Sequence, residues 1–193
     1  FVTNIILSPN GVTQNAEQFE FKRVWTEQCK VAFAIGQLQS RSVHIRDCTS
    51  WGNVLRWIEC SSYGTGSGQL PYVHGGNIAG HLKYLLHCTG AAVSSGQIDG
   101  LYAESIFSLG ECSIDQVTFR SCQFQFGMPS STIAGAQTHF KCSKNALFDG
   151  CLLIHSANPP DVKPLGFSRN VTFINCVFDV LPIGNQYQAR GLT

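Results

Sequence analysis

The sequence predicts an all-β protein, a single-stranded right-handed parallel β-helix (solenoid) of about six to seven coils with loop insertions. Three observations predict this fold. A short motif recurs along the chain, the apolar residues inside it alternate with a period of two, and no long segment has the 3.6-residue apolar period of a helix. We expect one β-helix domain or fragment over residues 1–193, with the repeats at about 17–180 and both ends cut from a longer chain.

The motif consists of an apolar residue, any residue, an aromatic or aliphatic residue, any residue, a turn-type residue and Cys. Its steps range from 24 to 40 residues, and the longer steps contain Gly-, Ser- and Pro-rich stretches that are typical of loops. A short minimal period with variable loops indicates a solenoid. The six copies, of which the first and third are degenerate, end at Val24, Cys48, Cys88, Cys122, Cys151 and Cys176.

Within a copy, the alternation indicates strands that meet at a sharp corner. In the last copy Val171 and Phe173 share one face, Thr172 takes the other, and the phase then shifts by one residue. A one-residue turn produces that shift, and Asn, Asp and Gly tolerate the left-handed backbone best. We therefore predict corners at the residues that precede the cysteines of four copies, namely Asp47, Ser121, Gly150 and Asn175.

The nine cysteines are interpreted as small, buried, reduced core residues that stack inside the coils after each corner. Their number is odd, the chain is long enough not to need disulfides, and no Cys-x-x-Cys pair is present. We expect no metal site and no cofactor. Strand-borne histidines such as His44 and His87 are expected to face outward into solvent.

The composition excludes several partners. Charged residues make up 13% of the chain and the formal net charge is +1, so the basic stripe of a nucleic-acid-binding protein and the polybasic patch of a membrane-surface protein are absent. No apolar run reaches the roughly 18 residues that a membrane span needs. A neutral surface rich in hydroxyl and amide groups suits contact with a polysaccharide or with a neighbouring protein chain.

If the chain cleaves polysaccharides, the candidate catalytic residues are Glu104 first, with Asp99 and Asp115 second. A glycoside hydrolase needs two carboxylates about 5 to 9.5 Å apart around one glycosidic bond. The stacking of coils could bring these acidic residues together on one face. The alternative is that they are solvated surface residues or bond the corners.

The candidate contacts to a glycan or to another subunit are aromatic, because Trp and Tyr offer flat faces to sugar rings and are enriched at interfaces. The longest insertion, residues 63–76, is the favoured contact loop. The alternative is that the aromatic residues fill the core. The five candidates are Trp25, Trp51, Trp57, Tyr63 and Tyr72.

The repeats at Val117–Phe124 and Val171–Phe178 resemble those of the pectin-lyase-like right-handed β-helix superfamily, and Ile98–Glu104 resembles a phrase of bacteriophage tail and tailspike proteins. The resemblance implies a section of a long homotrimeric tail protein, virion-borne or extracellular, that recognises glycans on the host surface. We expect this recognition role rather than catalysis. The alternatives left open are a polysaccharide-degrading hydrolase or lyase and a secreted bacterial adhesin.

Overall fold

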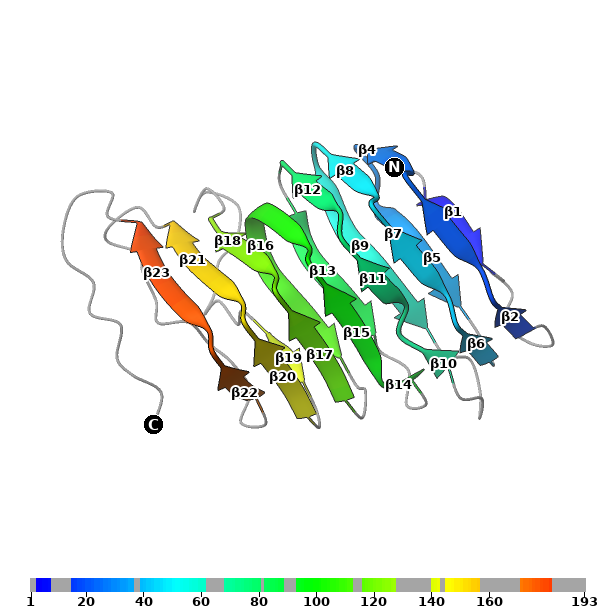
Figure 1. Cartoon of the computed structure of the whole chain (residues 1–193). Coiled ribbons are helices and arrows are strands. Elements are labelled where there is room, and N and C mark those ends of the chain that lie inside the picture. The colour runs from blue at the N-terminus through cyan, green and yellow to red at the C-terminus, as the bar shows by residue number, and fades with distance from the viewer. Residues whose placement is uncertain are drawn as a thin grey trace.

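The computed structural model confirms an all-β parallel solenoid (Figure 1). It describes residues 3–7, 15–36, 39–61, 68–80, 82–88, 93–112, 116–127, 140–142, 145–156 and 171–181. Strands in the described residues pair in parallel, and none of these residues forms a helix. Accordingly, the described chain has no helix that is long and apolar enough to cross a membrane.

The first wall of the solenoid is a seven-stranded parallel sheet that receives one strand from each successive coil. Its strands are β3 (Glu20–Lys22), β7 (His44–Arg46), β11 (Tyr72–His74), β15 (Gly96–Asp99), β17 (Gln116–Arg120), β20 (Asn145–Asp149) and β22 (Val171–Ile174).

The second and third walls form one continuous sheet, because β16 (Tyr102–Cys112) bends from one wall into the other. The second wall comprises β4 (Trp25–Glu27), β8 (Thr49–Trp51), β12 (Asn77–Ala79), the start of β16, β18 (Gln123–Phe126), β21 (Leu152–Ser156) and β23 (Val177–Leu181). The third wall comprises β1 (Thr3–Leu7), β5 (Val31–Gly36), β9 (Val54–Ser61), β13 (Leu82–Cys88), the end of β16 and β19 (Lys141–Cys142). Two small pairs are β2 (Asn15–Glu17) with β6 (Gln39–Arg41) and β10 (Gly68–Gln69) with β14 (Val93–Ser94).

About four turns of the solenoid are complete, which is fewer than the six to seven predicted coils. The prediction counted one coil for each copy of the motif. The coils that begin with β20 and β22 have described strands on the first and second walls only, so they do not add complete turns to the described chain.

One-residue corners join the first wall to the second, as predicted. The four predicted corner residues Asp47, Ser121, Gly150 and Asn175 all have left-handed backbone, with φ between 48° and 62°. Arg23, Gly75 and Gly100 occupy the same place in the other coils. The backbone N–H of each corner from Arg23 to Gly150 donates to a carbonyl oxygen of the next coil, so the bends are tied to one another along the stack.

Two of these corners belong to copies of the motif that the sequence reading missed. The segments Pro71–Gly76 and Gly96–Leu101 occupy the place of the motif, but they begin with Pro and Gly and end in Gly and Leu instead of Cys. The degenerate copy that ends at Cys88 was placed wrongly, because β13 lies on the third wall. Cys88 is therefore in register with Cys60 and Cys112 and not with Cys48.

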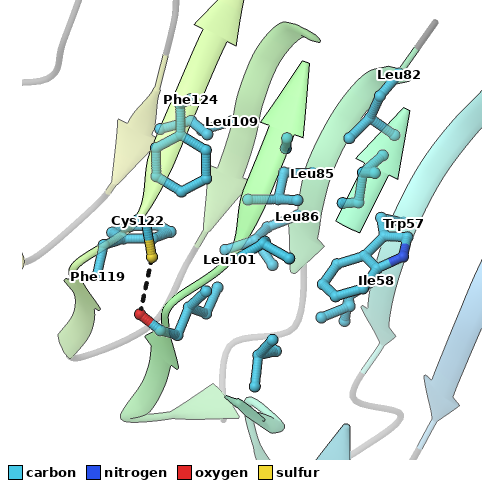
Figure 2. Packing of buried hydrophobic residues seen from close by; sticks show 14 of the residues in the cluster. Trp57, Ile58, Leu82, Leu85, Leu86, Leu101, Leu109, Phe119, Cys122 and Phe124 are labelled. Carbon is cyan, nitrogen blue, oxygen red and sulfur yellow. Dashed lines mark hydrogen bonds between the residues drawn. The ribbon is translucent and has the colours of Figure 1, made fainter. Parts of the chain in front are cut away.

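The core is a set of columns that run along the solenoid. On the first wall, the inward side chains Phe119, Phe148 and Phe173 are in register, and their rings stack at centroid separations of 4.5 and 5.0 Å. Figure 2 shows Phe119 and Phe124 beside the leucines of the core. The N-terminal end of the same column consists of Phe21, Ile45, Val73 and Ile98.

The structure describes the side chains of seven cysteines; none of these seven forms a disulfide, and all but Cys176 are buried, as predicted. Each cysteine that follows a corner lies close to two carbonyl oxygens. The Cys122 Sγ, for example, is 3.2 Å from the carbonyl oxygen of Arg120 and 3.3 Å from that of Ile98 in the preceding coil. Figure 2 draws one bond of Cys122 as a dashed line. The same arrangement recurs at Cys48, Cys151 and Cys176.

Candidate functional site

Two tryptophans are the most exposed large apolar side chains on the second wall near its N-terminal end. Trp25 is 63% exposed and Trp51 is 50% exposed. They lie on the neighbouring strands β4 and β8, where Trp25 pairs with Thr49 and Trp51 pairs with Glu27. Both side chains therefore lie on the outer face, offset by one strand and two residues, which corresponds to about 8 Å between their backbones. We call Trp25 and Trp51 the tryptophan pair.

Trp57 has a different role from the other two tryptophans, so the prediction of a contact residue is wrong for it. Its side chain is fully buried in the core (Figure 2). Its ring meets Phe33 edge-on at 5.7 Å, and its indole N–H donates to the Ser50 hydroxyl at 2.7 Å. The Ser50 oxygen also lies 2.5 Å from that of Thr26, so this buried polar group has partners.

The outer face of the first wall carries a cluster of aromatic and ionisable side chains, which we call the first-wall cluster: His44, Arg46, Tyr72, His74 and Asp99. Neighbouring coils place these residues in register, with Tyr72 beside His44, and His74 between Arg46 and Asp99. The rings of His44 and Tyr72 stack at 5.3 Å, and those of His44 and His74 lie 5.5 Å apart.

Hydrogen bonds and charges hold this cluster in place. The Nδ1 of His44 lies 3.3 Å from the Nε2 of His74. Arg46 forms an ion pair with Glu20 of the preceding coil. Burial lowers the pKa of the His74 imidazole, and the nearby Arg46 and His44 lower it further, whereas Asp99 and Glu20 oppose the shift.

Asp99 lies in this cluster and is only half-exposed. Its Oδ2 accepts a hydrogen bond of 2.6 Å from the amide of Gln97. Its Oδ1 is buried and has no hydrogen-bond partner in the described residues. The structure therefore brings Tyr72, predicted as a contact residue, and Asp99, predicted as a catalytic residue, into one cluster. His74 lies on the same strand as Tyr72 and pairs with Asp99 on the next strand.

Glu104 lies on the second wall, beyond the corner at Gly100 that separates it from Asp99. Its Oε2 accepts a hydrogen bond of 3.0 Å from the Tyr102 hydroxyl. Burial raises the pKa of Tyr102, and the bond to the Glu104 carboxylate raises it further. The two carboxyl groups lie on different walls, and the catalytic role of Asp99 and Glu104 stays a prediction.

Asp115 and Tyr63 lie outside the described residues, so the structure does not place them. No group of three or more His, Cys, Asp or Glu side chains in the described ranges is arranged to hold a metal ion.

The residue that the sequence reading missed is His74. His44 was expected to be solvated, but it is half-buried and contacts both Tyr72 and His74. The signal that could have found the pair is the overlooked copy Pro71–Gly76, because aligning it with the copy ending at Cys48 places Tyr72 beside His44 and His74 beside Arg46.

The fold and these two surfaces define the chain as a parallel β-solenoid that displays aromatic side chains on its outer walls. Comparisons with family models, with curated proteins and with solved structures found no match to it.

Proposed function

We propose that this chain is a structural and glycan-recognition section of a phage tail or tailspike-like protein, and that the tryptophan pair contacts the glycan. The observation that carries the proposal is the exposure of Trp25 and Trp51 on one sheet face. Trp has a large apolar body with a polar N–H, and leaving two such side chains in water is unfavourable unless a ligand or partner covers them.

The spacing of the pair favours an extended ligand. Because Trp25 and Trp51 belong to successive coils, a chain of sugars that runs diagonally across β4 and β8 could stack one ring on each indole. Glu27, which pairs with Trp51 and is exposed, supplies a carboxylate that could accept hydrogen bonds from sugar hydroxyls. The low content of charged residues, 13%, also suits a neutral polyhydroxylated ligand.

The phage-tail assignment rests on the resemblance of the repeats and of Ile98–Glu104 to those proteins. It includes homotrimer formation by the full-length protein at the host surface. Light scattering on the purified full-length protein tests the trimer, and a monomer would contradict this component of the proposal.

The experiment is binding of the chain to a panel of bacterial capsular polysaccharides and lipopolysaccharides, measured by calorimetry or interferometry. We expect Trp25→Ala and Trp51→Ala each to weaken binding at least fivefold, since truncating an interface tryptophan commonly costs about 1 kcal/mol or more. The double variant should abolish measurable binding.

The matched control is Val177→Ala. Val177 is 59% exposed on the same wall but at its C-terminal end, so this change should leave glycan binding intact. The proposal is wrong if no polysaccharide binds the native chain, or if the double tryptophan variant binds as well as the native chain does. Release of shorter sugars from the panel would instead support the polysaccharide-degrading alternative.

A further inference from the structure

The His44–His74 contact has the geometry of a hydrogen bond between two imidazoles. The ring planes differ by 13°, the centroids are 5.5 Å apart, and the facing nitrogens are 3.3 Å apart. The distance between the ring centres exceeds the distance between the two nitrogens by nearly two ring radii. Each nitrogen therefore lies close to the line that joins the ring centres, and the two nitrogens face each other. Such a bond needs one nitrogen that carries a hydrogen and one that offers a lone pair.

His74 has charged neighbours on both sides. Arg46 pairs with it on β7, and Asp99 pairs with it on β15. Glu20 on β3 acts on it from further away, and Tyr72 shares its strand. The Asp99 Oδ1 has no hydrogen-bond partner in the described residues, so a protonated His74 has an unused acceptor available on the side opposite to His44.

We propose that the His44–His74 contact is a pH-sensitive switch on the first wall: it holds while at least one ring is neutral, and when both rings are protonated it breaks and His74 pairs with Asp99. When both imidazoles are cations, every ring nitrogen is a donor, and the facing nitrogens repel each other. The Arg46 guanidinium beside His74 adds to the repulsion. The stacking of Tyr72 on His44 then changes as well.

The switch goes beyond the proposed glycan binding because it requires no ligand and lies on a different wall from the tryptophan pair. The lowered pKa of His74 agrees with it, since the environment disfavours the second positive charge.

The test is an NMR titration of the imidazole Cε1–H signals of the chain without any glycan. The signals of the six histidines are assigned with single His→Gln variants. We expect the His74 midpoint to lie below the ordinary value of 6.5. His44→Gln should raise this midpoint, and Asp99→Asn should lower it. Nuclear Overhauser contacts between the His44 and Tyr72 rings, present at pH 8, should weaken below the midpoint.

The control is His87→Gln, which changes a histidine of the third wall and should leave the His74 titration unchanged. The proposal is overturned if His74 in the native chain titrates at or above 6.5. It is also overturned if His44→Gln lowers the midpoint or leaves it unmoved, and if Asp99→Asn does not lower it. Asp99→Asn retains the bond-forming geometry of the side chain, so it tests the proposal even if His44→Gln fails to fold.

Discussion

Replacing Phe148 with alanine should remove a large part of the packing in the first-wall column. Phe148 is fully buried. Its ring stacks on Phe119 at 4.5 Å and on Phe173 at 5.0 Å, and meets Phe140 edge-on at 6.1 Å. Removing it takes one ring from each of these contacts and leaves a cavity between two coils. Phe→Ala changes in well-packed cores cost about 3–5 kcal/mol, and we expect the upper half of that range because the neighbouring coils are fixed by backbone hydrogen bonds.

Urea denaturation followed by circular dichroism measures this loss as a change in the free energy of unfolding. The matched control is Leu147→Ala, one residue earlier on β20 and half-exposed on the outer face. The control should cost about 1 kcal/mol or less. Equal losses for the two variants, or a larger loss for Leu147→Ala, would refute the assignment of inner and outer faces.

Three further predictions concern the backbone and the thiols. Gly110→Ala should unfold the chain or lower its melting temperature sharply, because the added Cβ would lie 1.7 Å from the Leu86 carbonyl oxygen. The control Gly100→Ala, whose Cβ would have only contacts of 3.9 Å, should cost about 1–2 kcal/mol for its left-handed backbone. Similar effects of the two changes on the melting temperature would contradict the packing at Gly110. The free energy of unfolding should fall as pH rises above about 9, because burial raises the pKa of the Cys29 and Cys48 thiols above 9.0 and the unfolded chain loses these protons first. Urea denaturation at pH 8 and pH 10 measures this fall, and Cys48→Ala should make it smaller. A higher free energy of unfolding at pH 10 than at pH 8 would contradict the prediction. A reducing agent should leave the melting temperature unchanged, and a large drop would reveal a disulfide.

Much of the fold could be predicted from the sequence because the corner and the cysteine after it form a local signal. Asp47–Cys48 and Asn175–Cys176 can be recognised without any knowledge of the other coils. The copies that end at Gly76 and Leu101 are harder to recognise, because Gly or Leu follows the corner there in place of Cys. The assignment of each strand to a wall could not be predicted either where stretches of unequal length separate the strands in the sequence.

The third wall shows why the role of Trp57 could not be predicted. In β9, Leu55 and Arg56 are both half-exposed, and the next two residues, Trp57 and Ile58, are both buried. The strand β13 repeats this pattern, with Leu85 and Leu86 buried together. A strand with this irregularity does not alternate with a period of two, so strict alternation gives the wrong face for half of its residues.

The candidate site depended on register between coils, which the sequence does not state. His44 and His74 are 30 residues apart, with the Gly-rich stretch that contains Tyr63 between them in the sequence. Only the pairing of β7 with β11 brings the two rings together. Likewise, Trp25 and Trp51 are exposed because they point outward from short strands. The residue that follows Trp25, Thr26, and the residue that precedes Trp51, Ser50, are buried hydroxyl residues that point inward.

The central claim is that the chain climbs by one strand spacing per coil, with Lys22, Arg120 and Ile174 exposed on one outer column of the first wall. Pulsed electron resonance between spin labels tests it directly, with labels introduced as noncanonical amino acids to avoid the native thiols. Four coil steps separate Lys22 from Arg120 and six separate it from Ile174, so the backbone distances should be about 19 Å and about 29 Å. A distance from Lys22 to Ile174 that is equal to or shorter than the distance from Lys22 to Arg120 would contradict the solenoid.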